Sequence, residues 1–172
     1  MIQNRIITVF GAYGHTGRFV VRELRKRGFT PILSGRDAAK LKEAGNAHPG
    51  SEVRVATVDD PASLDRALSD AVAVINCAGP FIDTAGSIID AALRASIHYL
   101  DVAAEQAAVL AVFERFASAA RTAGVVVAPA MAFYGGLGDL LSTAAMGEWD
   151  ASASNCRARL RCRFRPPHPT PP

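Results

Sequence analysis

Three glycines at intervals of three residues follow the first apolar run of the chain, residues 5–10. In a Gly-x-x-Gly-x-x-Gly turn after a strand, the first glycine permits a sharp turn and the second lets the backbone approach a pyrophosphate. The third lets the next helix pack closely on the sheet, with its N–H groups aimed at the anion. A flexible glycine loop without a ligand is the alternative. The spacing predicts a dinucleotide site that includes Gly11, Tyr13, Gly14, His15, Thr16 and Gly17.

The end of the expected second strand bears on the choice of dinucleotide. It reads Ser34-Gly35-Arg36-Asp37. An acid at this point accepts a hydrogen bond from the ribose of NAD, whereas an arginine pairs with the 2′-phosphate of NADP. We expect Arg36 to contact that phosphate and Ser34 to add a hydrogen bond. Asp37 is better explained as a helix cap, so NADP is favoured over NAD. A solvated Arg36 on the surface is the alternative.

A third polar position closes the expected third strand. Asp59 lies where this fold places the adenine, and its carboxylate could accept a hydrogen bond from the exocyclic amine. An ordinary acid at the start of the following helix, which Asp60-Pro61 begins, is equally compatible with the pattern. Asp59 is therefore a predicted cofactor contact with an open alternative.

The elements that must position these residues alternate between strand and helix patterns. Apolar runs predict strands at residues 5–10, 30–34, 53–58, 72–77, 97–102 and 125–128. Helical spacing predicts helices at 15–27, 88–95, 105–123 and 138–146. Two further helices are expected: one is capped by Asp37, runs through 41–44 and stops at Gly45, and the other begins after Asp60. Apolar strands separated by helices indicate an α/β fold: a doubly wound parallel sheet of about six strands, of the Rossmann type. In the helix at 105–123, Val109, Val112, Phe113 and Phe116 are expected on one side.

Charge separates the body of the chain from its end. The formal charge of the 172 residues is +3, but residues 151–172 hold five arginines and no acid, which leaves 14 − 16 = −2 for the rest. We therefore expect a folded domain at 1–148 and a disordered Arg- and Pro-rich tail at 149–172. A basic tail can bind nucleic acid nonspecifically, but a nucleic-acid binder that acts through the tail is the weakest of the alternative functions, so nucleic acid is an unlikely partner.

Several other classes of protein do not fit the sequence. No apolar stretch is long enough to span a bilayer and no signal peptide is evident, so a cytoplasmic location is expected. Cys77, Cys156 and Cys162 form neither a disulfide framework nor a metal site, and a buried, inert thiol is expected at Cys77. The Tyr-x-x-x-Lys motif of short-chain dehydrogenases is absent, because Gly17, Ala103 and Gly138 lie four residues after the three tyrosines, Tyr13, Tyr99 and Tyr134.

Four motifs together resemble a known family. They are residues 11–18 (GAYGHTGR), the Ser34-Gly35-Arg36 step with Lys40-Leu41 after it, 76–81 (NCAGPF) and 98–101 (HYLD). In this order and spacing they are similar to the N-terminal NADP-binding domain of the saccharopine dehydrogenase-like family, over about residues 5–148. That family includes saccharopine reductases and the trans-acting enoyl reductases of actinobacterial lipid synthesis.

The resemblance implies further site residues. Asn76, Ala78, Gly79 and Pro80 resemble the segment that passes under the cofactor toward the nicotinamide. His98, Tyr99, Asp101 and Glu105 resemble the family's segment at the end of strand five, which implies a place near the site. The alternative is structural: Tyr99 packed in the core and Asp101 capping the next helix. No catalytic acid or base is assigned. The glycine-rich segment 133–139 resembles the loop that leads to a substrate domain, a plain hinge being the alternative.

The resemblance implies an oxidoreductase that transfers a hydride to or from a small substrate, which the sequence does not identify. Family members are about twice as long and carry a second domain that selects the substrate. The arginine- and proline-rich end suggests a truncation or frameshift near residue 151, which resequencing would test, and little turnover by the chain alone. A dinucleotide-binding sensor without catalysis is the alternative. A homodimer is one assembly open to the chain, and the sequence does not determine the oligomeric state.

Overall fold

The computed structural model describes residues 5–146 of the chain. The chain divides into two units between Asp139 and Leu140, and the described residues of these units are 5–139 and 140–146. The last described helix, α6 (Gly138–Met146), belongs for the most part to the second unit. The tail expected at 149–172, with Cys156, Cys162 and the suspected frameshift near residue 151, lies outside the described residues.

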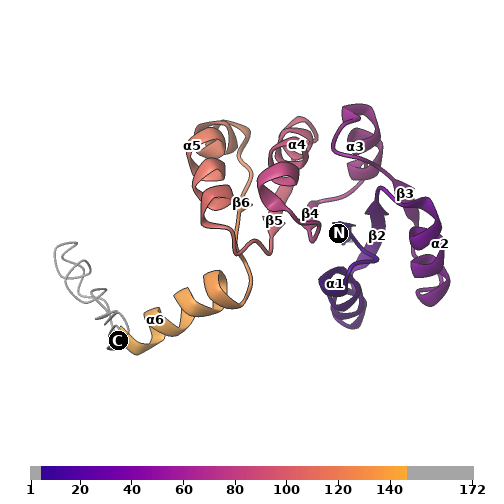
Figure 1. Cartoon of the computed structure of the whole chain (residues 1–172), viewed down its shortest axis with the longest axis horizontal. Helices are drawn as coiled ribbons and strands as arrows, with labels where there is room; N and C mark the ends of the chain where they lie inside the picture. Colours follow the sequence, from indigo (N-terminus) through magenta and orange to yellow (C-terminus); the bar gives the residue numbers. More distant parts are fainter. Residues whose placement is uncertain (1–4, 147–172) are drawn as a thin grey trace, which may run out of the picture. The chain divides into compact units, whose positions relative to one another are not determined.

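The first unit is built on a six-stranded parallel sheet in the order β3-β2-β1-β4-β5-β6 (Figure 1). The strands are β1 (Ile6–Phe10), β2 (Thr30–Gly35), β3 (Val53–Val55), β4 (Ala73–Asn76), β5 (His98–Asp101) and β6 (Val127–Ala128). The chain crosses from the β3 edge back to the centre after β3, so the order reverses between β1 and β4. This confirms the doubly wound Rossmann-type sheet predicted from the sequence.

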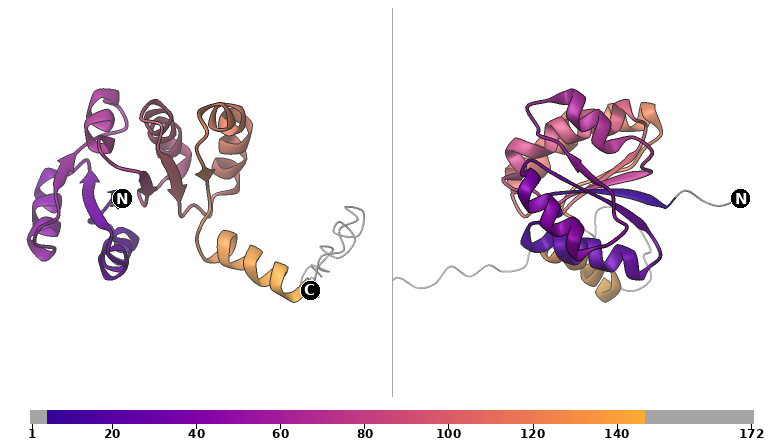
Figure 2. Two further views of the ribbon diagram at one scale, coloured as in Figure 1. Left: turned by 180° about the vertical axis from the view of Figure 1, so that it is seen from behind. Right: turned by 90° about the vertical axis from the view of Figure 1, so that its right-hand side faces the viewer.

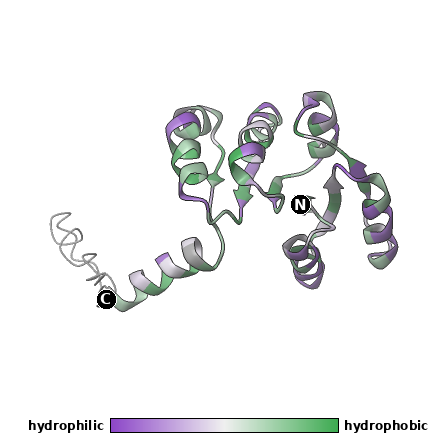
Figure 3. Ribbon diagram, in the orientation of Figure 1, coloured by the Kyte–Doolittle hydropathy of each residue, from purple (hydrophilic) through white to green (hydrophobic). Residues whose placement is uncertain are grey.

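Helices cover both faces of this sheet, as the right-hand view of Figure 2 shows. The helices are α1 (His15–Lys26), α2 (Ala38–Ala47), α3 (Pro61–Leu68), α4 (Phe81–Arg94) and α5 (Gln106–Ala123). Leucines and valines of α1 and α2 pack with Val9 and Leu33 on one face, whereas α3, α4 and α5 pack with Phe10 and Val74 on the other. In Figure 3, α1 and α2 carry many hydrophilic residues and β4 is hydrophobic. The carboxyl ends of all six strands meet at one edge of the sheet.

Some predicted boundaries are wrong. Helix α2 continues through Gly45 to Ala47, and β3 ends at Val55 instead of reaching residue 58. Helix α4 begins at Phe81, seven residues before its predicted start, because its first turn is capped by a side chain from a distant segment. In α5 the buried face is Ala108, Val112, Phe116 and Ala120, so Phe113, which is 56% exposed, does not belong to it.

Within residues 5–146, no helix has the length and apolar character needed to cross a membrane. The same residues contain no cluster of three histidine, cysteine or acidic side chains suited to a metal ion.

Candidate dinucleotide-binding site

The turn after β1 brings Gly11 against the end of β4. The Gly11 and Ala12 N–H groups donate to the Ser34 carbonyl, at 2.8 and 3.1 Å, which joins the turn to β2. Gly11 has φ +81°, and a Cβ there would lie 3.0 Å from both Cβ and N of Ala78. Only glycine meets both requirements, because a larger residue would be strained in its backbone and crowded by Ala78.

The other two glycines set the start of α1. Gly14 is the N-cap and offers no side-chain acceptor to the first N–H groups of the helix. Its own N–H donates to the Gly11 carbonyl at 3.0 Å. A Cβ on Gly17 would overlap the Gly11 carbonyl oxygen and lie 2.9 Å from Ala12 Cα. The glycines therefore let the positive end of α1 come close to the turn, where an anion would be stabilised.

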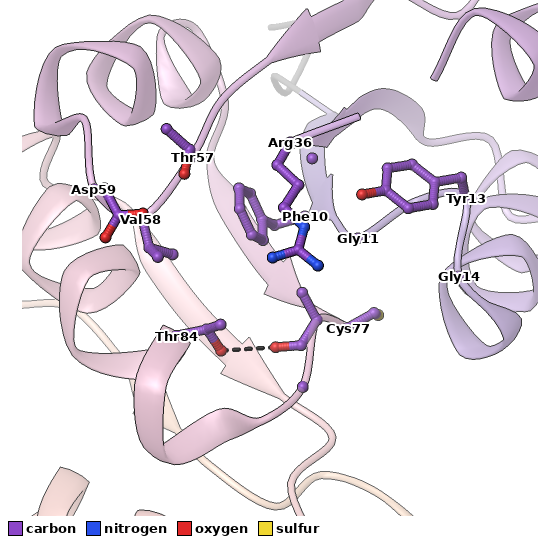
Figure 4. Close-up of a pocket in the computed structure, with 13 residues that line it drawn as sticks. Phe10, Gly11, Tyr13, Gly14, Arg36, Thr57, Val58, Asp59, Cys77 and Thr84 are labelled. Atoms are coloured by element: carbon purple, nitrogen blue, oxygen red, sulfur yellow. Dashed lines mark hydrogen bonds between the residues drawn. The ribbon is translucent and has the colours of Figure 1, made fainter. Parts of the chain in front are cut away.

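A cavity of about 310 Å³ opens beside this turn, at the carboxyl edge of the sheet (Figure 4). It is lined by Phe10, Gly11, Tyr13, Gly14, Gly35, Arg36, Thr57, Val58, Asp59, Cys77, Ala78, Gly79 and Thr84. Figure 4 shows the Arg36 side chain reaching into the cavity and the Tyr13 hydroxyl directed toward the cavity from the turn after β1. The cavity therefore joins the ends of β1, β2 and β4 and the segment after β3.

Arg36 supplies an uncompensated positive charge. It is exposed and makes no hydrogen bond or ion pair with any of residues 5–146. The neighbouring acid is engaged elsewhere: Asp37 caps α2 by accepting from Lys40 N–H at 3.1 Å and lies 3.4 Å from Lys40 Nζ. These hydrogen bonds, led by the one from the Lys40 backbone, hold the pKa of Asp37 below its ordinary value. The predicted cap at Asp37 is confirmed.

Seven of the predicted contacts lie together in the cavity: Gly11, Tyr13, Gly14, Arg36, Asp59, Ala78 and Gly79. The residues that sequence reasoning missed are Phe10, Gly35, Thr57, Val58, Cys77 and Thr84. Gly35 has a physical signal: a Cβ there would lie 2.8 Å from the Tyr13 ring, so the glycine makes room for the tyrosine. Thr57, Val58 and Thr84 become neighbours only through the crossing of the chain between β3 and β4.

The remaining predicted contacts, His15, Thr16, Gly17, Ser34, Asn76 and Pro80, do not line the cavity. Ser34 is fully buried and its Oγ has no hydrogen-bond partner among residues 5–146, so the strand directs this side chain into the protein. His15 is exposed and packs edge-on against Phe19, with ring centroids 5.2 Å apart, beside a separate hollow. Thr16 is exposed. The peptide bond between Gly79 and Pro80 is cis.

Cys77 forms part of the cavity wall. It is partly buried, and its N–H donates to the Phe10 carbonyl at 2.8 Å, which extends the pairing of β1 with β4. Burial, and then the charge of Asp101, raise the pKa of the Cys77 thiol to about 12. The thiol therefore stays protonated at neutral pH. The buried thiol expected from the sequence is corrected, because Cys77 is only partly buried and lines the cavity, and its inertness stays a prediction.

Behind the cavity wall lies a buried network of polar side chains. Asn76 accepts from Ala78 N–H at 2.9 Å and donates to Thr84 Oγ1 at 3.2 Å and to the Tyr99 hydroxyl at 3.3 Å. Tyr99 donates to Asp101 Oδ2 at 2.9 Å. Burial, followed by the Asp101 charge, raises the pKa of Tyr99 well above its ordinary value, so the hydroxyl keeps its proton and remains a donor.

Asp101 is 1% exposed and ties the loop after β5 to the loop after β6. Its Oδ1 accepts from Ala103 N–H at 2.9 Å and from Ala130 N–H at 2.8 Å. Its expected role as a cap of the next helix is therefore corrected: α5 begins only at Gln106, and the Asp101 carboxylate binds two loops instead. Tyr99 is packed in the core, as the structural alternative predicted.

The other two members of this motif are also engaged with backbone. His98 is exposed, and its Nδ1 accepts from Val126 N–H at 3.1 Å, at the edge where β6 pairs. The Glu105 carboxylate accepts from Phe81 N–H at 3.1 Å and from Ile82 N–H at 3.0 Å. Glu105 thus caps α4, which has no cap of its own at Pro80. None of His98, Tyr99, Asp101 and Glu105 lines the cavity.

Comparisons with known proteins agree with this geometry. Residues 7–127 match the family model of the saccharopine dehydrogenase NADP binding domain. A probable mitochondrial saccharopine dehydrogenase-like oxidoreductase of Arabidopsis thaliana is 32% identical over 114 residues, which cover 58% of this chain and 25% of that protein. A human saccharopine dehydrogenase-like oxidoreductase is 30% identical over 117 residues, which cover 58% of this chain and 27% of the human protein. The matched part therefore spans about a quarter of these relatives.

Solved structures share the fold. An apo saccharopine dehydrogenase (L-Glu forming) from Saccharomyces cerevisiae superposes with a TM-score of 0.62 at 18% identity, over 74% of this chain and 27% of that one. A Citrobacter triphenylmethane reductase complexed with NADP(H) superposes with a TM-score of 0.56 at 24% identity, over 72% of this chain and 48% of the reductase. The fold, the glycine turn and the family match lead to one conclusion: the chain belongs to the saccharopine dehydrogenase NADP-binding domain family, and NADP is its cofactor.

Proposed function

We propose that the cavity receives the adenosine 2′-phosphate half of NADP, while the glycine turn holds the pyrophosphate. The observation that carries this proposal is Arg36, whose guanidinium reaches into the cavity at the end of β2 without a partner among residues 5–146. A guanidinium offers planar, paired donors to a phosphate. Lys40, with its Nζ 5.9 Å from the Tyr13 ring centroid, adds positive charge on the same side.

The shape of the site fits this group. Gly11 and Gly14 leave the backbone bare where a Cβ would meet Ala78 or the Gly11 carbonyl, which is the approach that a pyrophosphate needs. Val58 and Asp59 lie across the cavity from Arg36, which suits the adenine (Figure 4). Ala78 and Gly79 share this cavity, so we assign them to the adenosine side, whereas the family resemblance suggested a path toward the nicotinamide.

The reaction that we propose is hydride transfer to or from a small substrate. NADP supplies the hydride chemistry when it is bound, and the protein supplies binding and orientation. The titratable groups of the cavity wall lie on the side proposed for adenosine, so we expect the substrate to be bound by other residues. These groups are Tyr13, Arg36, Asp59 and the protonated Cys77. Membership of an oxidoreductase family favours this reading over a non-catalytic sensor.

The direct test is a titration of the full chain with NADPH and with NADH, repeated for Arg36→Asp. We expect the variant to lose about 100-fold in NADPH affinity, because it loses a charge-assisted phosphate contact and gains a repulsive charge. NADH affinity should stay within about threefold, since NADH has no 2′-phosphate. Arg22→Asp makes the same change of charge on the exposed face of α1 and should leave the preference unaltered.

Two results would count against the proposal. An unchanged NADPH preference in Arg36→Asp would remove Arg36 from the phosphate site. Folded wild-type protein that binds neither nucleotide would remove the site itself.

A further inference from the structure

The cavity wall at Ala78 is held on both of its backbone polar groups by side chains. Asn76 Oδ1 accepts from the Ala78 N–H at 2.9 Å, and the Thr84 hydroxyl donates to the Ala78 carbonyl at 2.7 Å. Figure 4 shows this second hydrogen bond at the cavity edge. Because both groups are fixed, neither of the two peptide units that flank Ala78 can rotate without breaking a hydrogen bond in a partly buried place.

Asn76 is itself oriented by residues of β5. Its amide is fully buried, with its oxygen on Ala78 and its nitrogen shared between Thr84 and the Tyr99 hydroxyl. Tyr99 accepts from this nitrogen and can then donate only in the other direction, to Asp101. The donors and acceptors therefore run one way, from amide to hydroxyl to carboxylate, and every member has a partner.

A second support reaches the same loop from the other side. The Glu105 carboxylate holds the Phe81 and Ile82 N–H groups, directly after Pro80. The loop from Cys77 to Pro80 is thus fixed at Ala78 by Asn76 and Thr84 and at its far end by Glu105. It lies opposite Gly11, where no space is left for a Cβ.

We propose that Asn76, Thr84, Tyr99, Asp101 and Glu105 are positioning residues for the adenosine side of the NADP site. They do not line the cavity, apart from Thr84, and they act through Ala78 and the start of α4. This assignment rests on the proposed function, because that proposal places adenosine against Ala78. It gives a positioning role to Tyr99, Asp101 and Glu105, none of which lines the cavity.

The test is affinity for two ligands, NADPH and adenosine 2′,5′-bisphosphate, which contains the adenosine half alone. We expect Tyr99→Phe and Thr84→Val in the full chain to lower the affinity for both ligands by the same factor, about tenfold. The reason is that the altered wall contacts the adenosine half, which both ligands contain. Thr84→Ser keeps the hydroxyl and should bind both ligands like the wild type. The fluorescence of the reduced nicotinamide in the bound state should not change.

A matched control separates positioning from a general loss of stability. Thr8 is fully buried on β1, and its hydroxyl, like that of Thr84, donates to a backbone carbonyl. The acceptor is the Ala67 carbonyl of α3, at 2.9 Å, which lies outside the cavity wall. Thr8→Val should lower the thermal midpoint as much as Thr84→Val does, without changing either affinity.

The possible results are distinct. Unchanged affinities in Tyr99→Phe and Thr84→Val would overturn the inference. A Thr84→Ser protein that binds the two ligands as weakly as Thr84→Val does would also overturn it. If Tyr99→Phe does not fold, the comparison of Thr84→Val with Thr84→Ser tests the inference by itself. Wild-type protein that binds NADPH but not the bisphosphate would overturn the assignment of the cavity to adenosine.

Discussion

The two halves of the sheet contribute to the site in opposite ways. On the side of β1, β2 and β3, the site consists of bare backbone and an unpaired cation: Gly11 and Gly14 remove side chains, and Arg36 stays free of partners among residues 5–146. On the side of β4, β5 and β6, polar side chains are buried and satisfied by one another, as at Asn76 and Asp101.

This difference separates binding from support. A group that binds a charged ligand must be left without a partner in the protein, so it lies at the surface and can be recognised by residue type. A group that supports the site must be satisfied internally, because a buried polar atom without a partner is costly. A mutation of the unpaired Arg36 should therefore change affinity alone, and a mutation of a supporting side chain in the second half should change affinity and stability together.

The largest effect is expected at Gly17. In Gly17→Ala the new methyl group would overlap the Gly11 carbonyl, so α1 must move away from the turn. We expect a loss of about 3 kcal/mol in unfolding free energy, by chemical denaturation, and a loss of NADPH binding of at least about 100-fold. Gly86→Ala is the control, because Gly86 is also a helical glycine without a positive φ, and its Cβ position lies 3.5 Å from Arg115 Nη1, an ordinary contact. Equal behaviour of the two variants would refute the packing argument.

Asp101→Asn comes next and belongs to the supporting half. The amide can no longer accept at both ends, so its nitrogen must face the Tyr99 hydroxyl or the N–H groups of Ala103 and Ala130. We expect a loss of about 2 kcal/mol in unfolding free energy. Hydrogen exchange should be faster at the Ala130 amide than in the wild type. Protection of Ala130 at the wild-type level would show that the carboxylate does not hold this loop.

The Cys77 thiol offers a smaller effect, read in pH dependence. The folded protein holds its pKa near 12, above the ordinary 9.0, so the native state keeps a proton that the unfolded chain releases. The sign follows: the stability associated with this thiol is present below pH 9 and is lost as the pH rises from 9 toward 12. Cys77→Ala should flatten the fall in thermal midpoint across this range. Alkylation of Cys77 at pH 8, measured by peptide mapping, should be slower than that of free glutathione.

The smallest change in nucleotide preference is expected at Asp37, which follows Arg36 at the end of β2. Because its carboxylate caps α2 and pairs with Lys40, it should not select between nucleotides. Asp37→Asn keeps the cap, and its NADPH to NADH preference should stay within about twofold of the wild type, as expected of an exposed ion pair. A large shift in that preference would return Asp37 to the ribose site.

The sequence was a good guide where structure depends on neighbouring residues. The glycine spacing predicted the turn and the tight start of α1, and Asp60-Pro61 predicted the start of α3, where Asp60 accepts from Ala62 N–H at 3.0 Å. Apolar runs predicted all six strands and hence the doubly wound sheet. Each of these features is encoded within a few residues, by backbone freedom, by a cap or by hydrophobic periodicity.

It was a poor guide where structure depends on distant partners. The early start of α4 follows from Glu105, and the place of Thr84 in the cavity wall follows from the crossing between β3 and β4. The position of Ser34 predicted a phosphate ligand, yet its side chain is buried and has no hydrogen-bond partner within the described part of the chain. No local pattern distinguishes a polar residue that faces a ligand from one that faces the interior.

The contact between the Gly11 turn and Ala78 has a consequence for how the protein acquires ligand affinity as it folds. The two walls come from segments far apart in the chain, and they meet only when β1 and β4 pair. A partly folded chain that lacks β4 has no cleft, so NADP cannot stabilise such intermediates and can shift the equilibrium only toward the complete unit. Protection from proteolysis by the nucleotide should therefore extend over the whole sheet at once.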